Sequence, residues 1–177
     1  METETLKYPI GQAEIPEEIT MMVVSAAIER IAALPDQLRQ AVANLEDKQL
    51  DSPYRPEGWT LRQVVHHVAE SHMNGFIRFK WALTEDTPKI KAYNEQFWSG
   101  YSDVREAPVD ISLNLLSALH TKWTFLMKSI SDEEWSRQYF HPEAKRAYML
   151  KESVLVYDWH GRHHLAHITS LKNSMNW

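Results

Sequence analysis

Four of the nine histidines in this 177-residue chain lie in one short stretch near the C-terminus, at positions 160, 163, 164 and 167. When residues 151–175 are wound as a helix, His160 and His164 fall inside the apolar stripe, one turn apart. Their Cβ atoms are then roughly 5–6 Å apart, so both imidazoles could reach one ion. His167 lies near the stripe and His163 at its edge. Two imidazoles do not complete a metal site, so a facing segment must supply a third ligand.

A second segment offers three histidines as the third ligand. His72 is closest to the centre of its apolar stripe, His67 lies on the flank, and His66 points towards Arg62. Each helix of a bundle faces two neighbours, so a flank position can also point into the core. Periodicity alone therefore leaves His67 and His72 equal. The alternative is that these histidines are hydrogen-bonded core residues or form a partly solvated face.

Apolar residues recur at three- and four-residue steps in four long segments, the spacing of helices with one buried face. The first contains Pro35, which should kink or restart the helix. The second begins at Thr60, where Thr60 and Gln63 match a capping box. The segments cover residues 17–45, 60–84, 110–130 and 150–175. We therefore predict an all-α four-helix bundle that forms one domain over residues 1–177.

The segments between these helices carry turn residues and aromatic side chains. Residues 1–16 predict an extended N-terminal arm, and residues 51–58 predict a turn. The long crossover at 87–108 contains Tyr93, Phe97, Trp98 and Tyr101 and is either a lid over a site or a cap on the bundle. Residues 131–148 predict a short acidic helical turn and no particular chemistry. His120, at the edge of the third helix, is interpreted as structural.

Composition excludes several functional classes. The chain has no cysteine, so any metal must be held by histidines and carboxylates. A net charge of −5 without a basic run argues against nucleic-acid binding. Neither a membrane-spanning run nor a secretory signal is present, which favours a cytoplasmic protein with no membrane partner. Glycine motifs for dinucleotides or phosphates are also missing.

The stretch WTLRQVVHHVAE, residues 59–70, resembles the signature W-[ST]-x-x-[EQ]-x-x-x-H-x-x-[DE] of the DinB/YfiT-like superfamily of metal-binding four-helix bundles. The later His-x-x-x-His pair is similar to the second part of that pattern. The resemblance covers nearly the whole chain, from Tyr8 onward. It is closest to the bacillary branch of predicted metal-dependent hydrolases, which is linked to bacillithiol S-transfer.

Aligned on Trp59, the resemblance implies that His67 is the first ligand and that His160 and His164 complete the set. The acidic position three residues after the first ligand is Glu70. Three imidazoles leave positions open on a divalent ion, as in catalytic sites. Imidazole suits Zn²⁺ first and Ni²⁺ next, and one ion per subunit is expected. Family members are often homodimers, so the resemblance also implies a homodimer.

Two reactions suit such an ion. It could hold a small thiol as a thiolate that attacks an electrophile, or it could generate hydroxide that hydrolyses an ester or amide. Hydrolysis needs a general base, and the candidates are Glu70 and Asp158, which the helical period turns outward. For Glu70, orienting a metal ligand is the favoured role over general-base catalysis. We therefore favour transfer of bacillithiol to small electrophiles, and we expect the aromatic residues of segment 93–101 to line the substrate site. A metal-dependent hydrolase is the alternative, followed by a non-enzymatic metal- or ligand-binding protein.

Overall fold

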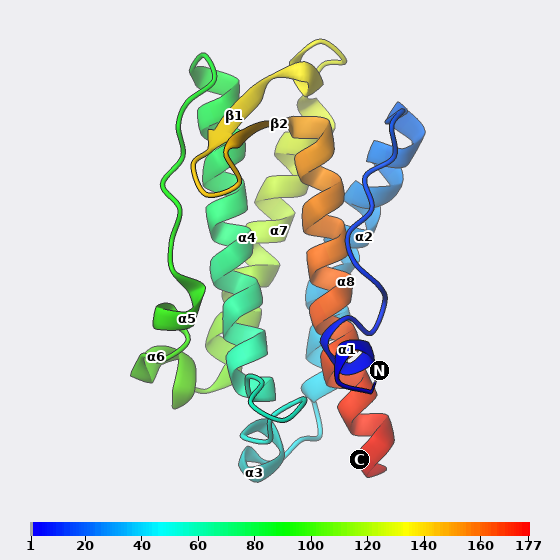
Figure 1. Cartoon of the computed structure of the whole chain (residues 1–177), viewed down its shortest axis with the longest axis vertical. Coiled ribbons are helices and arrows are strands. Elements are labelled where there is room, and N and C mark those ends of the chain that lie inside the picture. Colours follow the sequence, from blue (N-terminus) through cyan, green and yellow to red (C-terminus); the bar gives the residue numbers. More distant parts are fainter. Residues whose placement is uncertain (1) are drawn as a thin grey trace.

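The computed structural model describes residues 2–177, with side chains from residue 4 onward. Four long helices pack as a bundle, which confirms the predicted all-α fold (Figure 1). They are α2 (Met21–Val42), α4 (Leu61–Thr84), α7 (Val109–Ser129) and α8 (Leu150–Met175). Helices α2 and α4 each pack against both α7 and α8. The two helices that carry the histidine motifs, α4 and α8, are therefore direct neighbours.

Shorter elements join these helices. After α4 the chain runs back along the bundle before α7 begins, so α4 and α7 point in the same direction (Figure 1). The predicted long crossover is thus present. The short elements are α1 (Glu2–Lys7), α3 (Asp47–Leu50), α5 (Glu95–Trp98), α6 (Ser102–Arg105), the 3₁₀ turn η1 (Glu134–Ser136), β1 (Gln138–His141) and β2 (Arg146–Met149).

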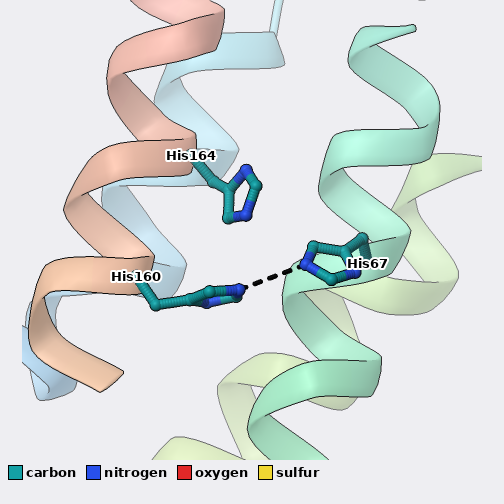
Figure 2. A group of neighbouring side chains, drawn as sticks. All are labelled: His67, His160 and His164. Carbon is teal, nitrogen blue, oxygen red and sulfur yellow. Dashed lines mark hydrogen bonds between the residues drawn. The ribbon is translucent and has the colours of Figure 1, made fainter. Parts of the chain in front are cut away.

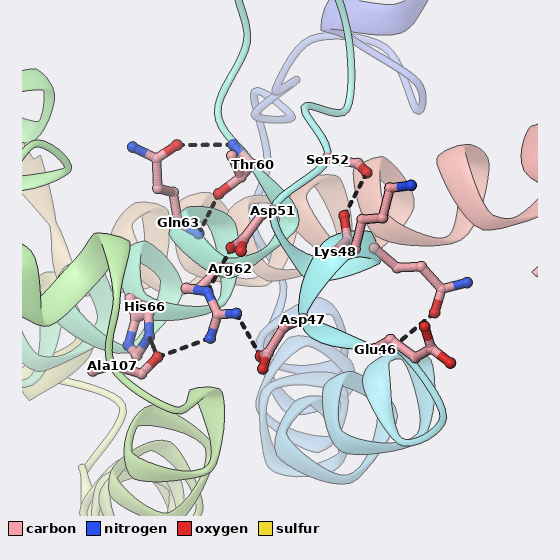
Figure 3. Close-up of polar contacts among 11 residues, drawn as sticks. Glu46, Asp47, Lys48, Asp51, Ser52, Thr60, Arg62, Gln63, His66 and Ala107 are labelled. Carbon is pink, nitrogen blue, oxygen red and sulfur yellow. Dashed lines mark hydrogen bonds and ion pairs between the residues drawn. The ribbon is translucent and has the colours of Figure 1, made fainter.

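The start of α4 is fixed by local hydrogen bonds. The Thr60 hydroxyl accepts a bond from the Gln63 backbone N–H at 3.2 Å, and the Gln63 side-chain oxygen accepts one from the Thr60 N–H at 2.9 Å. This is the predicted capping box. One residue into the helix, Arg62 donates to Asp47 and Asp51, both at 2.7 Å (Figure 3). These bonds join the first turn of α4 to α3 and so set the rotation of the helix.

Three local predictions were wrong or incomplete. The N-terminal arm is not wholly extended, because α1 forms before Pro9, which cannot continue a helix; Met1 lies outside the described residues. Helix α2 continues through the buried Pro35, so the helix does not restart there. Buried apolar residues on both sides of the proline pack in the core. Residues 138–149 form a two-stranded antiparallel hairpin that was not predicted. Its strands have four residues each, too few for a clear alternating pattern.

The core consists of two apolar clusters separated along the helices by histidines. One cluster contains Phe79 of α4 and Val154 of α8, and the other contains Val64 of α4 and Ile168 of α8. The histidines of both helices fall between these positions in the sequence. No helix within residues 2–177 is long and apolar enough to cross a bilayer. The bundle thus encloses a polar layer between two apolar halves.

Candidate metal centre

Three histidines converge from the two neighbouring helices. His67 extends from α4, and His160 and His164 extend from α8 into the space between them (Figure 2). The Nε2 atoms of His67 and His160 are 3.1 Å apart, and candidate ligand atoms of all three rings lie within 4.8 Å of one another. Two nitrogens on one tetrahedral zinc ion, with bonds of 2.0–2.1 Å, are about 3.4 Å apart. The spacing therefore fits three ligands of a single ion.

Burial keeps these imidazoles neutral at physiological pH. Desolvation, aided by His163, lowers the pKa of His67 to about 4. Desolvation and then the neighbouring histidines lower the pKa values of His160 and His164 well below the ordinary 6.5. A neutral ring carries a lone pair on one nitrogen, which a metal ion requires. The chemistry of this donor set therefore fits a divalent cation.

The other two histidines of α4 have different surroundings. His66 lies 2.7 Å from the Ser112 hydroxyl of α7. It also lies 3.1 Å from the Ala107 carbonyl, just before α7 (Figure 3). His72 is hydrogen-bonded to another histidine and to His160. Among the α4 histidines, only His67 joins the group of ligand atoms that includes His160 and His164. Periodicity had left this choice open.

A second group of three histidines shares one member with the first. His163, His164 and His167 are all buried, and their candidate ligand atoms also lie within 4.8 Å of one another. The sequence had placed His163 at the edge of the stripe, but Tyr8 and Trp159 cover it. Its Nδ1 is buried without a hydrogen-bond partner in the described part of the chain. His167 Nε2 lies 3.1 Å from the Lys7 carbonyl.

Two cavities meet at the first group. A cavity of 280 Å³ reaches His67, His160 and His164 from the side of the N-terminal arm. Another, of 390 Å³, reaches His160 from the side of the hairpin. Glu95 of α5 lines both. The first cavity therefore gives access to all three histidines, and the second reaches His160 alone of the three.

The two acids considered as general bases differ in their surroundings. The outward orientation predicted for Asp158 is wrong, because this side of α8 faces α2. Asp158 is 4% exposed and accepts two bonds from Arg30, at 2.8 and 2.9 Å, and two from Arg162. Glu70 is half-buried, and desolvation followed by the charge of Asp103 raises its pKa to about 7. Among the described side chains, Glu70 makes no hydrogen bond to His67.

The crossover contributes polar residues, rather than an aromatic wall, to the cavities. Phe97 and Tyr101 are 73% and 66% exposed and line neither cavity. Tyr93 packs against Trp98 and is the one predicted aromatic residue in the second cavity. Sequence reasoning missed several other lining residues, because they lie on the arm, the hairpin and α4 far from any motif. They are Lys7, Tyr8, Arg78, His141 and Glu143.

Comparison with known proteins identifies the family. The model of the DinB superfamily matches residues 30–168 of the chain. This chain belongs to the DinB superfamily. A Bacillus cereus relative named "Putative metal-dependent hydrolase" is 48% identical over 172 residues, which is 97% of this chain and 98% of the relative. The Bacillus subtilis protein YfiT, given the same description, is 44% identical over 177 residues and covers 100% and 99% of the two chains.

Solved structures agree with this assignment to the DinB superfamily. The structure of Bacillus subtilis YfiT, described as having an unusual four-helix bundle topology, matches with a TM-score of 0.96 over 98% of this chain and 99% of that one. A mycothiol-dependent maleylpyruvate isomerase matches with a TM-score of 0.66 at 16% identity, over 82% and 60% of the chains. The second match shows a shared fold only. The resemblance found in the sequence is thus confirmed.

Proposed function

We propose that this chain is a metal-dependent enzyme that transfers a small thiol, bacillithiol in the first instance, to small electrophiles. His67, His160 and His164 would hold one divalent ion per subunit, zinc before nickel. The observation that carries the proposal is the pair of cavities that meet at His160. Transfer between two molecules needs room for both next to the reactive centre, and hydrolysis needs room for one substrate and a water. We further propose that the protein is a homodimer.

The proposed reaction balances without a redox partner. The bound ion would supply the Lewis acidity that lowers the pKa of a thiol. The thiol gives its proton to solvent, the sulfur forms a bond to an electrophilic carbon, and the leaving group departs with the electrons of the broken bond. Lys7 and Arg55 line the first cavity and would attract an anionic group of the thiol. The indole of Trp59, 4.5 Å from the His67 ring, excludes water from one side of the centre.

A hydrolase is the second candidate, and Glu70 favours it. A carboxyl group with a pKa of about 7 suits a general base near neutral pH. The names of the relatives also support hydrolysis. The carboxylate would need to reach a water in the site, and it lines neither of the two cavities that meet there. We therefore place thiol transfer first.

The test is mass spectrometry of the metal-loaded protein with bacillithiol and a reactive small electrophile. Reactions without protein, with chelator and with His160→Ala serve as controls. Metal-dependent formation of the thiol conjugate supports the transferase. If the protein carries its metal and does not accelerate formation of the conjugate, the transferase proposal is contradicted. A panel of esters and amides then distinguishes a hydrolase from a metal-binding protein without turnover.

A further inference from the structure

A line of hydrogen bonds connects a main-chain carbonyl to the candidate ligand His160. His120 Nδ1 lies 2.6 Å from the Ile31 carbonyl oxygen on α2. His120 Nε2 lies 2.8 Å from His72 Nδ1, and His72 Nε2 lies 3.1 Å from His160 Nδ1. The line thus runs from α2 through α7 and α4 to α8. Neither His72 nor His120 belongs to the three-histidine group.

The carbonyl at one end fixes the direction of every bond. A carbonyl oxygen only accepts, so His120 Nδ1 carries a proton. His120 and His72 are 1% and 0% exposed, and no carboxylate bonds to either ring among the described residues, so both rings are neutral. His120 Nε2 must therefore accept from His72 Nδ1–H, and His72 Nε2 must accept from His160 Nδ1–H. The neutral His160 ring then has its lone pair on Nε2, the atom that faces His67.

We propose that His72 and His120 are positioning residues that fix the tautomer of His160 and so direct its Nε2 lone pair to the metal. The proposal rests on the metal site proposed above. Metal-bound histidines commonly donate their second N–H to an acceptor, and loss of that acceptor typically lowers metal affinity about 10- to 100-fold. Here the acceptor is a second imidazole, whose own tautomer depends on a third imidazole and a main-chain carbonyl.

The surroundings of His72 isolate this line from water. The rings of Trp123 and Tyr157 meet His72 edge-on, at centroid distances of 5.9 and 5.4 Å. The Tyr157 hydroxyl is occupied by a bond from Arg78 at 3.0 Å. No carboxylate bonds to His72 or His120 within the described residues. In the described part of the chain, the hydrogen bonds of the His72 and His120 rings are those of the line itself.

His164 has a shorter arrangement of the same kind. His167 Nε2 donates to the Lys7 carbonyl, so the neutral His167 accepts at Nδ1 from His164 Nδ1, 3.4 Å away. The His164 lone pair then lies on Nε2. Both candidate ligands of α8 would thus have their tautomers set by main-chain carbonyls. The arm that carries Lys7 contributes to the site in this way without supplying a ligand.

The first experiment measures the tautomer of His160 by ¹⁵N NMR of the metal-free, full-length protein. We expect the proton on Nδ1. A proton on Nε2 of His160 would overturn the proposal. This measurement needs neither a variant nor bound metal, so it gives an answer even if the proposed enzyme function fails.

Variants then test the line at a distance from the metal. His120→Phe does not touch His160, yet it should shift the His160 proton towards Nε2 and raise the Kd for zinc about 10-fold or more. His72→Phe should do the same, whereas His72→Gln, whose side-chain oxygen can accept from His160, should restore most of the affinity. His66→Phe is the matched control: it removes another buried, hydrogen-bonded imidazole from α4 and should leave zinc affinity unchanged. Equal losses in His120→Phe and His66→Phe, with the His160 tautomer unaltered, would contradict the proposal.

Discussion

Two histidine triads share His164 but differ in what they connect. The inter-helix triad, His67, His160 and His164, joins α4 to α8, and its member His160 lines two cavities. The single-helix triad, His163, His164 and His167, lies entirely on α8 against the N-terminal arm. Both groups are compact, so compactness alone does not identify a metal centre. The difference lies in which nitrogen atoms are free.

In the single-helix triad, three of the six ring nitrogens form the hydrogen bonds that the described chain shows. His167 Nε2 is bonded to the Lys7 carbonyl and its Nδ1 to His164. The buried His163 Nδ1 has no hydrogen-bond partner in the described chain. In the inter-helix triad, His160 Nδ1–H donates to His72 and His164 Nδ1–H donates to His167, so each of these two rings keeps its lone pair on Nε2. Hydrogen bonds thus indicate where a metal would bind, and four predictions test the contrast.

The largest effect is expected from removing a ligand of the inter-helix triad. His160→Ala or His67→Ala should abolish stoichiometric zinc binding, because a site with two imidazoles no longer encloses the ion. Metal content measured by mass spectrometry after dialysis checks this. Retention of the metal by either variant would show that the inter-helix triad is not the centre.

The next effect concerns stability. An ion that joins α4 to α8 binds only the native state, so zinc at about 100 times its Kd should add about 2.7 kcal/mol. For a chain of this length that raises Tm by about 5–10 °C. Calorimetry with zinc and with chelator measures the difference. His160→Ala should show no zinc-dependent rise, and a rise of equal size in that variant would assign the metal to the other triad.

The sequence predicted the parts of this contrast that depend on helical period. The three- and four-residue spacing of apolar residues and the Thr60 capping box predicted the four helices. The apolar stripe of α8 predicted that His160 and His164 lie on one face. The identity of the third histidine came from the family resemblance, because both His67 and His72 point into the bundle. Bonds such as Asp158 to Arg30 join residues far apart in sequence, so helical period could not reveal them. The hairpin and the arm line the cavities through contacts that no local pattern encodes.

A smaller effect is expected from acid at His167 of the single-helix triad, in the absence of metal. Burial lowers the pKa of His167 to about 4 in the native state, against about 6.5 unfolded. Between these values the unfolded state binds more protons, so stability falls as pH falls from about 6.5 to 4. His167→Gln should reduce that slope by at most about 1.4 kcal/mol per pH unit. Urea unfolding with chelator at pH 7 and pH 5 checks this, and an unchanged slope would show that His167 is not a buried neutral group.

The smallest effect is expected at His163, where the two triads differ most. The His163 ring stacks on Trp159 with 4.4 Å between the ring centroids, and His163→Phe keeps an aromatic ring in that place. The substitution removes the buried Nδ1 that has no hydrogen-bond partner in the described chain. Leaving such a group unpaired costs about 1–3 kcal/mol, so the variant should be as stable as the native chain or slightly more stable. Zinc affinity should change less than about threefold, well below the loss expected when a hydrogen-bond partner of a metal ligand is removed. Urea unfolding and chelator competition measure the two quantities. A loss of zinc as large as that of His160→Ala would place the metal centre at the single-helix triad. In the described chain, His163 makes no hydrogen bond to His67, His160 or His164, so it has no other direct way to affect zinc binding at the inter-helix triad.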